Sequence, residues 1–105
     1  MLTRQWQSLL GLACRARMTI SGEEQVIQSI RAKKAFAVIM ANDASDRTKK
    51  TISNKCNYYD VPLLTVDNRE VLGRAIGQPE RVLVAVTDQG FGQRMIALLD
   101  QSTRG

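Results

Sequence analysis

The segment AFAVIMA, residues 35–41, is an apolar run without alternation. Alternating apolar and polar residues are typical of a strand with one solvated face, whereas a continuous run is typical of a strand covered on both faces. The run stops at Asn42 and Asp43, which favour turns. We therefore expect residues 35–41 to form a central strand of a sheet that carries helices on both faces.

Helix and strand patterns alternate on both sides of this segment. Further short apolar segments predict strands at residues 18–21, 61–66 and 81–86. Apolar residues spaced by three and four predict helices at residues 4–16, 22–33, 45–58, 67–77 and 89–99. The predicted fold class is α/β, a three-layer α/β/α sandwich around a central four-stranded, largely parallel or mixed sheet.

Two helix starts carry the pattern of a capping box. Ser21 is followed by Glu24, and Asp67 is followed by Glu70. In such a box the side chain of the N-cap residue accepts a hydrogen bond from the backbone amide three residues later. The carboxylate of that later residue accepts one from the backbone amide of the N-cap residue. Negative charge is also favourable in the first turn of a helix. The acids of SGEEQVIQ, residues 21–28, are thus explained without a ligand.

Length and charge limit the number of domains and the classes of partner that the chain can have. A chain of 105 residues predicts one domain, and we expect it to span residues 1–105. The formal charge of +5 and the pI near 9.7 favour an anionic partner, and nucleic acid is the first candidate. A basic surface that is merely solvated is the alternative.

Catalytic and cofactor chemistry finds no support in the residues. The chain has no histidine, and Cys14 and Cys56 alone cannot build a zinc site. The GxG of residues 88–95 has Met95 where a dinucleotide-binding fingerprint has its third glycine. A phosphorylated Asp43 would need Mg²⁺ and further carboxylates, so we expect Asp43 to cap or turn the entry to the third helix. We predict no enzyme activity, no cofactor and no metal.

The absence of membrane and secretion patterns, together with the cysteine spacing, indicates a cellular compartment. No apolar run approaches the roughly 20 residues that a membrane span needs. The first 17 residues have no signal-peptide pattern, and two cysteines without CxxC spacing are typical of free thiols in a reducing compartment. We therefore expect a cytoplasmic protein with no membrane partner.

Three segments in order carry a family resemblance: a helix opened by Gly22, IRAKKAFAVIMANDAS at residues 30–45, and VLGRAIG at residues 71–77 followed by the strand RVLVAV. Together they resemble the kink-turn-binding ribosomal protein family of the archaeal and eukaryotic large-subunit type. The match is best to its small bacterial, YlxQ-type members and spans about residues 8 to 99. The resemblance implies an α/β/α sandwich that binds kink-turn RNA.

The resemblance implies a first contact at the start of the second helix, which in the family enters the RNA groove beside tandem sheared G·A pairs. The family pattern there is a glycine, then asparagine and glutamate, then lysine. This chain keeps Gly22 but has Glu24, Gln25 and Gln28 at the other positions. Gln25 retains an acceptor and gains a donor for base edges. Glu24 adds a negative charge, and Gln28 lacks the cation of the family pattern.

A second implied contact is the loop after VLGRAIG, which in the family touches bases flipped out of the kink. Its counterparts are Gln78, Pro79, Glu80 and Arg81, and Arg69 stands where the family often has a basic residue. Arg69 can equally be a plain exposed residue of the fourth helix. Leu72, Ala75 and Ile76 are expected in the core, and Gly73 is expected to allow close packing.

The leading hypothesis is a non-enzymatic protein that binds structured, kink-turn-like RNA, for which ribosomal RNA is a candidate, together with ribosomal or other ribonucleoprotein proteins. The alternative is a protein-interaction module that keeps the fold and has lost kink-turn recognition. Five further basic residues gather at predicted helix ends and would grip phosphates if they lay beside the tip of the second helix: Arg15, Arg17, Arg31, Lys33 and Lys34. The hypothesis fails if Gly22 and the segment after Gly77 lie on opposite sides of the molecule.

Overall fold

A computed structural model describes residues 2–104, and the side chains of residues 5–99 within that range. Its sheet has four strands in the order β1-β4-β2-β3. The strands are β1 (Thr19–Ser21), β2 (Ala37–Ala41), β3 (Leu63–Val66) and β4 (Leu83–Val86). Residues 37–41 of the segment AFAVIMA therefore form a strand with a neighbour on each side, while Ala35 and Phe36 precede it.

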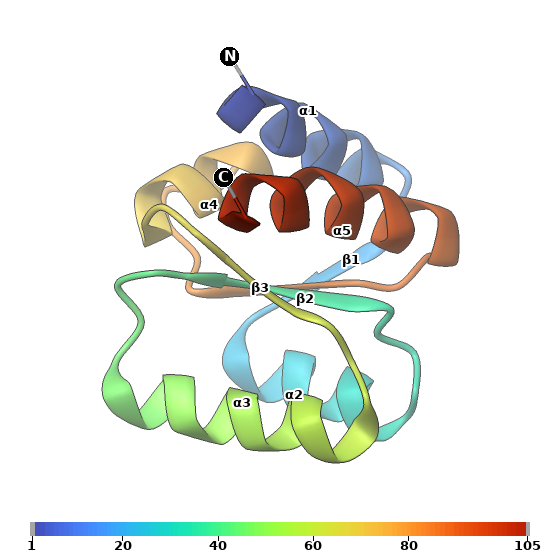
Figure 1. Cartoon of the computed structure of the whole chain (residues 1–105), viewed down its shortest axis with the longest axis vertical. Coiled ribbons are helices and arrows are strands. Elements are labelled where there is room, and N and C mark those ends of the chain that lie inside the picture. The colour runs from blue at the N-terminus through green and yellow to red at the C-terminus, as the bar shows by residue number, and fades with distance from the viewer. Residues whose placement is uncertain (1, 105) are drawn as a thin grey trace.

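Five helices cover the two faces of this sheet, which gives the predicted three layers (Figure 1). One face carries α1 (Leu2–Arg15), α4 (Arg69–Ala75) and α5 (Gln89–Arg104). The other carries α2 (Glu23–Arg31) and α3 (Asp46–Tyr59). No helix in the described part of the chain is long and apolar enough to cross a membrane. The predicted α/β/α sandwich is confirmed.

The sheet is mixed, which is the second of the two arrangements predicted from the sequence. Only β2 and β3 pair in parallel; β4 is antiparallel to both β1 and β2. The reason is the length of α4. A seven-residue helix rises only about 10 Å, so the chain leaves β3 and enters β4 at the same edge of the sheet. By contrast, α2 and α3 carry the chain from one edge to the other.

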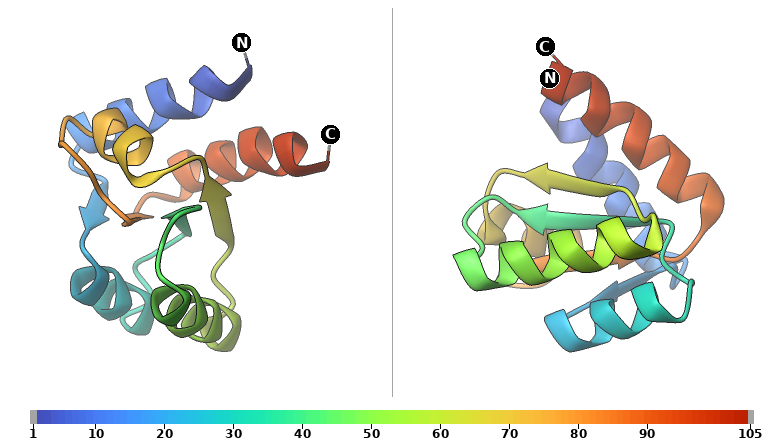
Figure 2. Two further views of the ribbon diagram at one scale, coloured as in Figure 1. Left: turned by 90° about the vertical axis from the view of Figure 1, so that its left-hand side faces the viewer. Right: turned by 60° about the horizontal axis from the view of Figure 1, so that its bottom comes forward.

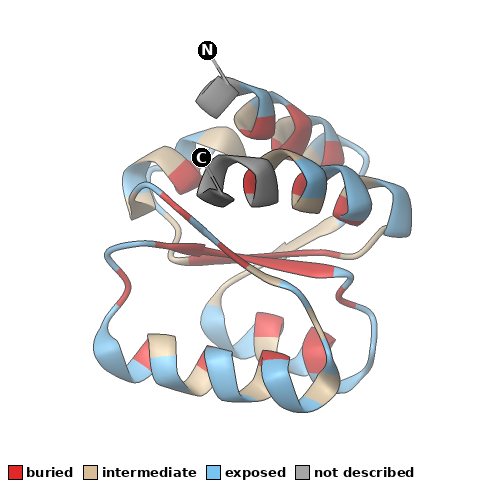
Figure 3. Ribbon diagram, in the orientation of Figure 1, coloured by how far each residue is buried: buried red, intermediate tan, exposed pale blue. Residues whose placement is uncertain are grey.

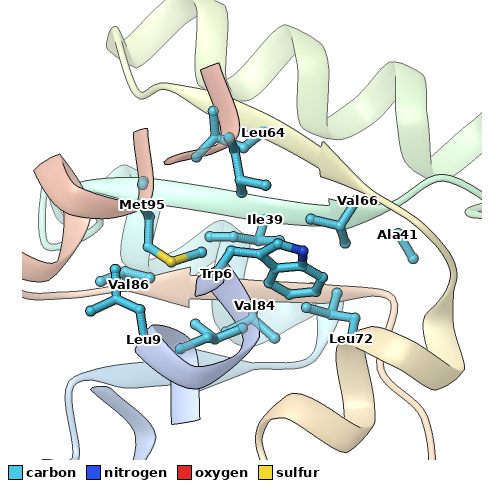
Figure 4. Close-up of a cluster of buried hydrophobic side chains, with 13 residues drawn as sticks. Trp6, Leu9, Ile39, Ala41, Leu64, Val66, Leu72, Val84, Val86 and Met95 are labelled. Carbon is cyan, nitrogen blue, oxygen red and sulfur yellow. The ribbon is translucent and has the colours of Figure 1, made fainter. Parts of the chain in front are cut away.

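Alternate residues of the central strand pack into two separate cores. Figure 3 shows that the strands in the middle of the sheet are buried. Ala37, Ile39 and Ala41 face α1, α4 and α5, whereas Val38 and Met40 face α2 and α3. All five residues are buried, which explains why the run shows no alternation. Figure 4 shows Trp6, Leu72 and Met95 packed around Ile39 and Val84 in the first core.

The two cysteines lie on opposite faces of the sheet and are free thiols, as predicted. Cys14 is half-buried on α1, and its Sγ lies 3.8 Å from the carbonyl oxygen of Ile76. Cys56 is buried in the core beneath α3, and burial raises the pKa of its thiol to about 11. Cys56 is therefore a neutral packing residue at physiological pH.

Candidate functional site

Four chain segments meet at the edge of the sheet where β1, β2 and β3 end and β4 begins. We call this the front edge and define it as residues 21–25, 42–46, 67–70 and 77–81. The left view of Figure 2 looks onto it and shows the α4–β4 connection running beside β1, above the start of α2. The two segments that the family resemblance singled out are therefore neighbours in space.

Arg81 joins those two segments directly. Its Nε donates to Ser21 Oγ at 3.3 Å, immediately before Gly22. Its Nη1 and Nη2 donate to the carbonyl oxygen of Glu80 at 2.7 Å and to Oε1 of Gln78 at 3.3 Å. Its backbone amide donates to the carbonyl oxygen of Arg69 at 2.9 Å. The side chain and backbone amide of Arg81 thus hold the end of β1, the loop and α4 in a single arrangement.

The tip of α2 has no side-chain cap, so the predicted capping box at Ser21 was wrong. Ser21 lies in β1, and Gly22 is the N-cap residue with φ of 98°. A Cβ on Gly22 would lie 2.6 Å from Oε1 of Gln25, so the glutamine amide folds back over the tip. Glu24, Gln25 and Gln28 are exposed there. Gly22 therefore permits both the turn and the placement of Gln25.

Glu23 was missed by the sequence patterns because its partner is remote in the chain. Oγ1 of Thr48 donates to Oε1 of Glu23 at 2.9 Å. Oγ of Ser45, the N-cap residue of α3 as predicted, accepts from the Thr48 amide at 3.1 Å. The starts of α2 and α3 are thereby tied together. No local motif signals a contact across 25 residues of chain.

The loop after α4 packs closely against that helix because Gly73 has no side chain. A Cβ on Gly73 would lie 2.4 Å from Cα of Glu80, so only glycine permits this approach. The expectation that Gly73 allows close packing is confirmed. Gln78, Pro79 and Glu80 are exposed on the outer side of the loop. Their backbone position is fixed while their side chains face solvent.

Asp43 and Arg69 are bound to each other. Oδ1 of Asp43 accepts from the Arg69 amide at 3.0 Å, and Oδ2 accepts from its Nε at 3.3 Å. Asp43 lies in the turn before α3, one of the two roles expected for it, but its side chain caps α4 and not α3. The N-cap residue of α4 is Asn68, whose Oδ1 accepts from the Val71 amide at 2.8 Å, so the predicted Asp67 box is also wrong.

Acidic residues dominate the front edge. Seven of the ten carboxylates of the chain lie in the four front-edge segments: Glu23, Glu24, Asp43, Asp46, Asp67, Glu70 and Glu80. The three helices that start at this edge, α2, α3 and α4, each have an acid in the first turn, which suits the helix dipole. Among the described residues, no three acidic or thiol side chains form a metal-binding group.

The five further basic residues are not beside the tip of α2. Arg31, Lys33 and Lys34 lie at its opposite end, and Arg15 and Arg17 lie at the end of α1. The sequence placed them at helix ends correctly. It could not show that these ends point away from the front edge, because that depends on helix direction in the assembled sandwich.

Comparison with known sequences gives a consistent result. Residues 4–96 match the family described as ribosomal protein L7Ae/L30e/S12e/Gadd45. The chain is 54% identical over 96 residues to the RNA-binding protein YlxQ of Bacillus subtilis (strain 168), covering 91% of this chain and 96% of that protein. It is 40% identical over 93 residues to the RNA-binding protein YlxQ of Enterococcus faecium, covering 89% of each.

Solved structures share the fold. A protein of unknown function from Bacillus halodurans C is 47% identical, with a TM-score of 0.90 over 91% of this chain and 97% of that one. The 15.5kD RNA binding protein of Giardia lamblia has a TM-score of 0.81 at 18% identity, over 95% of this chain and 88% of that one. At 18% identity, the similarity to the second structure shows the fold alone.

Proposed function

The chain belongs to the ribosomal protein L7Ae/L30e/S12e/Gadd45 family, and from this membership we propose that it is a non-enzymatic protein whose front edge binds kink-turn-like structured RNA. Its relatives from Bacillus subtilis and Enterococcus faecium are named RNA-binding proteins, which supports the RNA-binding part. The ribosome or another ribonucleoprotein is the proposed setting, with ribosomal or other ribonucleoprotein proteins as neighbours.

The observation that carries the proposal is the Arg81 bridge. Arg81 connects Ser21, beside Gly22, to Gln78 and Glu80 of the loop. The two segments that the family uses for RNA are thus held together before any ligand arrives. A preformed surface binds with less ordering cost than one that must assemble.

Recognition at this edge would depend on shape and hydrogen bonds more than on charge. The Gln25 amide at the tip offers both a donor and an acceptor to base edges. Gln78 and Pro79 offer exposed surface to unpaired bases, and structured RNA is read mainly through such bases and through shape. The carboxylates of Glu24 and Glu80 are exposed beside them and would repel phosphates. We therefore expect selective but weakly charge-assisted binding at the front edge.

The test is a titration with a kink-turn RNA and with an unkinked duplex of the same composition, each at several salt concentrations. Gln25→Ala should lower affinity for the kinked RNA about tenfold, because a base-edge contact is lost. Affinity for the duplex should change little. Gln5→Ala is the matched control, since Gln5 is exposed on α1 on the other face of the sheet. Equal wild-type affinity for both RNAs would reject kink-turn recognition.

A protein-interaction module remains the second candidate, because the front edge is rich in carboxylates and α2 has Gln28 where the family pattern has a lysine. A basic protein segment would suit such a surface. Affinity capture with and without RNase separates the two candidates. Partners that survive digestion and are lost when Glu24 and Glu80 are changed to glutamine would support the second candidate.

A further inference from the structure

The edge of the sheet opposite the front edge gathers unpaired cations. We call it the rear edge and define it as residues 15–18, 31–36, 59–62 and 87–91. It carries the basic cluster, five exposed residues: Arg15, Arg17, Arg31, Lys33 and Lys34. Within residues 5–99, the ion pair between Asp43 and Arg69 at the front edge is the only one. The basic cluster is therefore available to an external anion.

Carboxylates do not neutralise this cluster. The rear-edge segments contain two, Asp60 and Asp88. Oδ2 of Asp88 accepts from the Phe91 amide at 2.9 Å, where α5 starts. Asp60 is the C-cap residue of α3, on the β3 side of the edge. The two edges of one sandwich thus have opposite local charge.

Two exposed apolar side chains, Met18 and Phe36, lie at the same edge of the sheet as the basic cluster. Met18 and Phe36 are 36% and 41% exposed, well above the core residues beside them. The Thr87 amide donates to the carbonyl oxygen of Met18, and the Phe36 amide donates to that of Val86, both at 2.8 Å. Met18 and Phe36 therefore flank the end of β4, about 10 Å apart at two strand spacings. An exposed aromatic ring at an edge with cations is a surface on which a nucleic-acid base can stack.

Two of the cations occupy backbone positions that favour glycine. Arg17 and Lys33 have φ of 61° and 59°, immediately beyond the helices α1 and α2. The helix dipole explains a cation in the last turn, as at Arg15 and Arg31, but its effect falls off beyond that turn. Glycine would hold both turns with less strain. Strained residues kept at such positions point to a function for their side chains.

A groove connects the front edge with the basic cluster. It has a volume of about 450 Å³ and runs along α2 beside β1, from Gln25 in the first turn to Lys34 beyond the last. Its other lining residues are Ile20, Gln28, Ser29 and Ala32. A single strand that leaves the front edge at Gln25 therefore has a continuous path to the rear edge.

We propose that the rear edge is a second RNA contact: a strand that continues from the kink follows the groove along α2, sets its phosphates on the basic cluster and stacks a base on Phe36. This inference rests on the proposed function, because it needs RNA at the front edge to direct the strand. It assigns most of the electrostatic affinity to the rear edge and the selectivity to the front edge.

The experiment compares two triple variants of equal charge. Arg17→Gln, Lys33→Gln and Lys34→Gln together remove three rear-edge charges. Lys49→Gln, Lys50→Gln and Lys55→Gln together remove three charges from α3 and are the control. Each protein is titrated with a kink-turn RNA that carries a single-stranded extension and with the same RNA without it, at several salt concentrations.

The rear-edge triple variant should lose affinity for the extended RNA about tenfold or more at moderate salt. The slope of log affinity against log salt concentration should become shallower by about two, because three phosphate contacts are lost and each contributes about 0.7. The α3 triple should lose much less, and the RNA without the extension should respond little to either variant. Equal losses for the two triples would overturn the proposal, because only net charge would then matter.

Phe36→Leu tests the stacking contact separately. Affinity for the extended RNA should fall about fivefold or more with the salt slope unchanged, because a base loses its aromatic partner but no phosphate contact is lost. An unchanged affinity would remove Phe36 from the contact.

The two proposals fail in different ways. If wild type prefers kinked over unkinked RNA but the rear-edge triple changes nothing, the rear edge is not an RNA contact. If wild type shows no preference for the kink, yet the rear-edge triple still loses affinity and slope, the front-edge function is wrong. A partner that survives RNase and is lost in the rear-edge triple would show that the cluster docks an acidic protein, and would overturn the RNA contact.

Discussion

The front and rear edges are built from opposite ends of the same strands, yet they are held together by different kinds of contact. At the front edge, side chains remote in sequence bind one another, as in the pairs Arg81–Ser21 and Arg69–Asp43. At the rear edge, the turns are closed by local backbone bonds, such as Lys34 N to Ser29 O at 2.9 Å, and the cations face solvent. The comparison indicates that contacts between remote side chains fix the shape of the front edge, whereas the rear edge presents positive charge to solvent.

Helix direction explains the separation of charge. The helices α2, α3 and α4 begin at the front edge, where carboxylates suit their dipoles; α1 and α2 end at the rear edge, where cations do. Stability thus accounts for part of the pattern. It does not account for Arg17 and Lys33, which lie beyond the helices in strained turns.

The largest expected effect is a loss of stability with local loss of structure at the front edge alone. Gly73→Ala places a Cβ against the backbone of Glu80 and should lower the free energy of unfolding by about 3 kcal/mol. Hydrogen exchange should speed up at the amides of Gln78 and Arg81, while the Lys34 amide stays protected. Gly77→Ala is the control, because it has positive φ but open space and should cost only about 1 kcal/mol. Uniform loss of protection at both edges would contradict the separation.

An intermediate effect, of opposite sign, is expected at the rear edge. Arg17→Gly and Lys33→Gly should each raise the free energy of unfolding by about 0.5–1 kcal/mol, because they relieve left-handed backbone strain. Urea denaturation measures this. Lys34→Gly is the control: it lies next to Lys33 without positive φ, so added chain freedom should make it destabilising. If the first two variants are also destabilised, the turns are not strained.

The smallest effect concerns the ion pair at the front edge. Asp43→Asn keeps an oxygen acceptor for the Arg69 amide but removes the charge, and exposed pairs contribute about 0–1 kcal/mol. We expect a loss of about 0.5 kcal/mol in low salt that disappears in 1 M NaCl. Asp43→Ala should lose more and keep most of that loss in high salt, because the cap is gone as well. A salt-independent loss for Asp43→Asn would mean that the charge plays no part.

The candidate site could be predicted in outline from the sequence, but not in its contacts. Gly22 and the loop at residues 78–81 carry recognisable local patterns, and they do lie together. The bond from Arg81 to Ser21 spans 60 residues, and that from Arg69 to Asp43 spans 26. Capping was predicted one residue away from Gly22 and Asn68, because several neighbouring polar residues can cap a helix and tertiary partners select among them.

The sequence by itself determined the order of helices and strands, the burial of residues 37–41 on both faces, and the close packing at Gly73. These follow from periodicity and from side-chain size, which are local properties. Only the tertiary structure decided the antiparallel placement of β4, the capping of α4 by Asp43, and the separation of carboxylates and cations onto two edges. Each of these depends on where a helix points after the chain has crossed the sheet, and that direction is a property of the whole packed assembly.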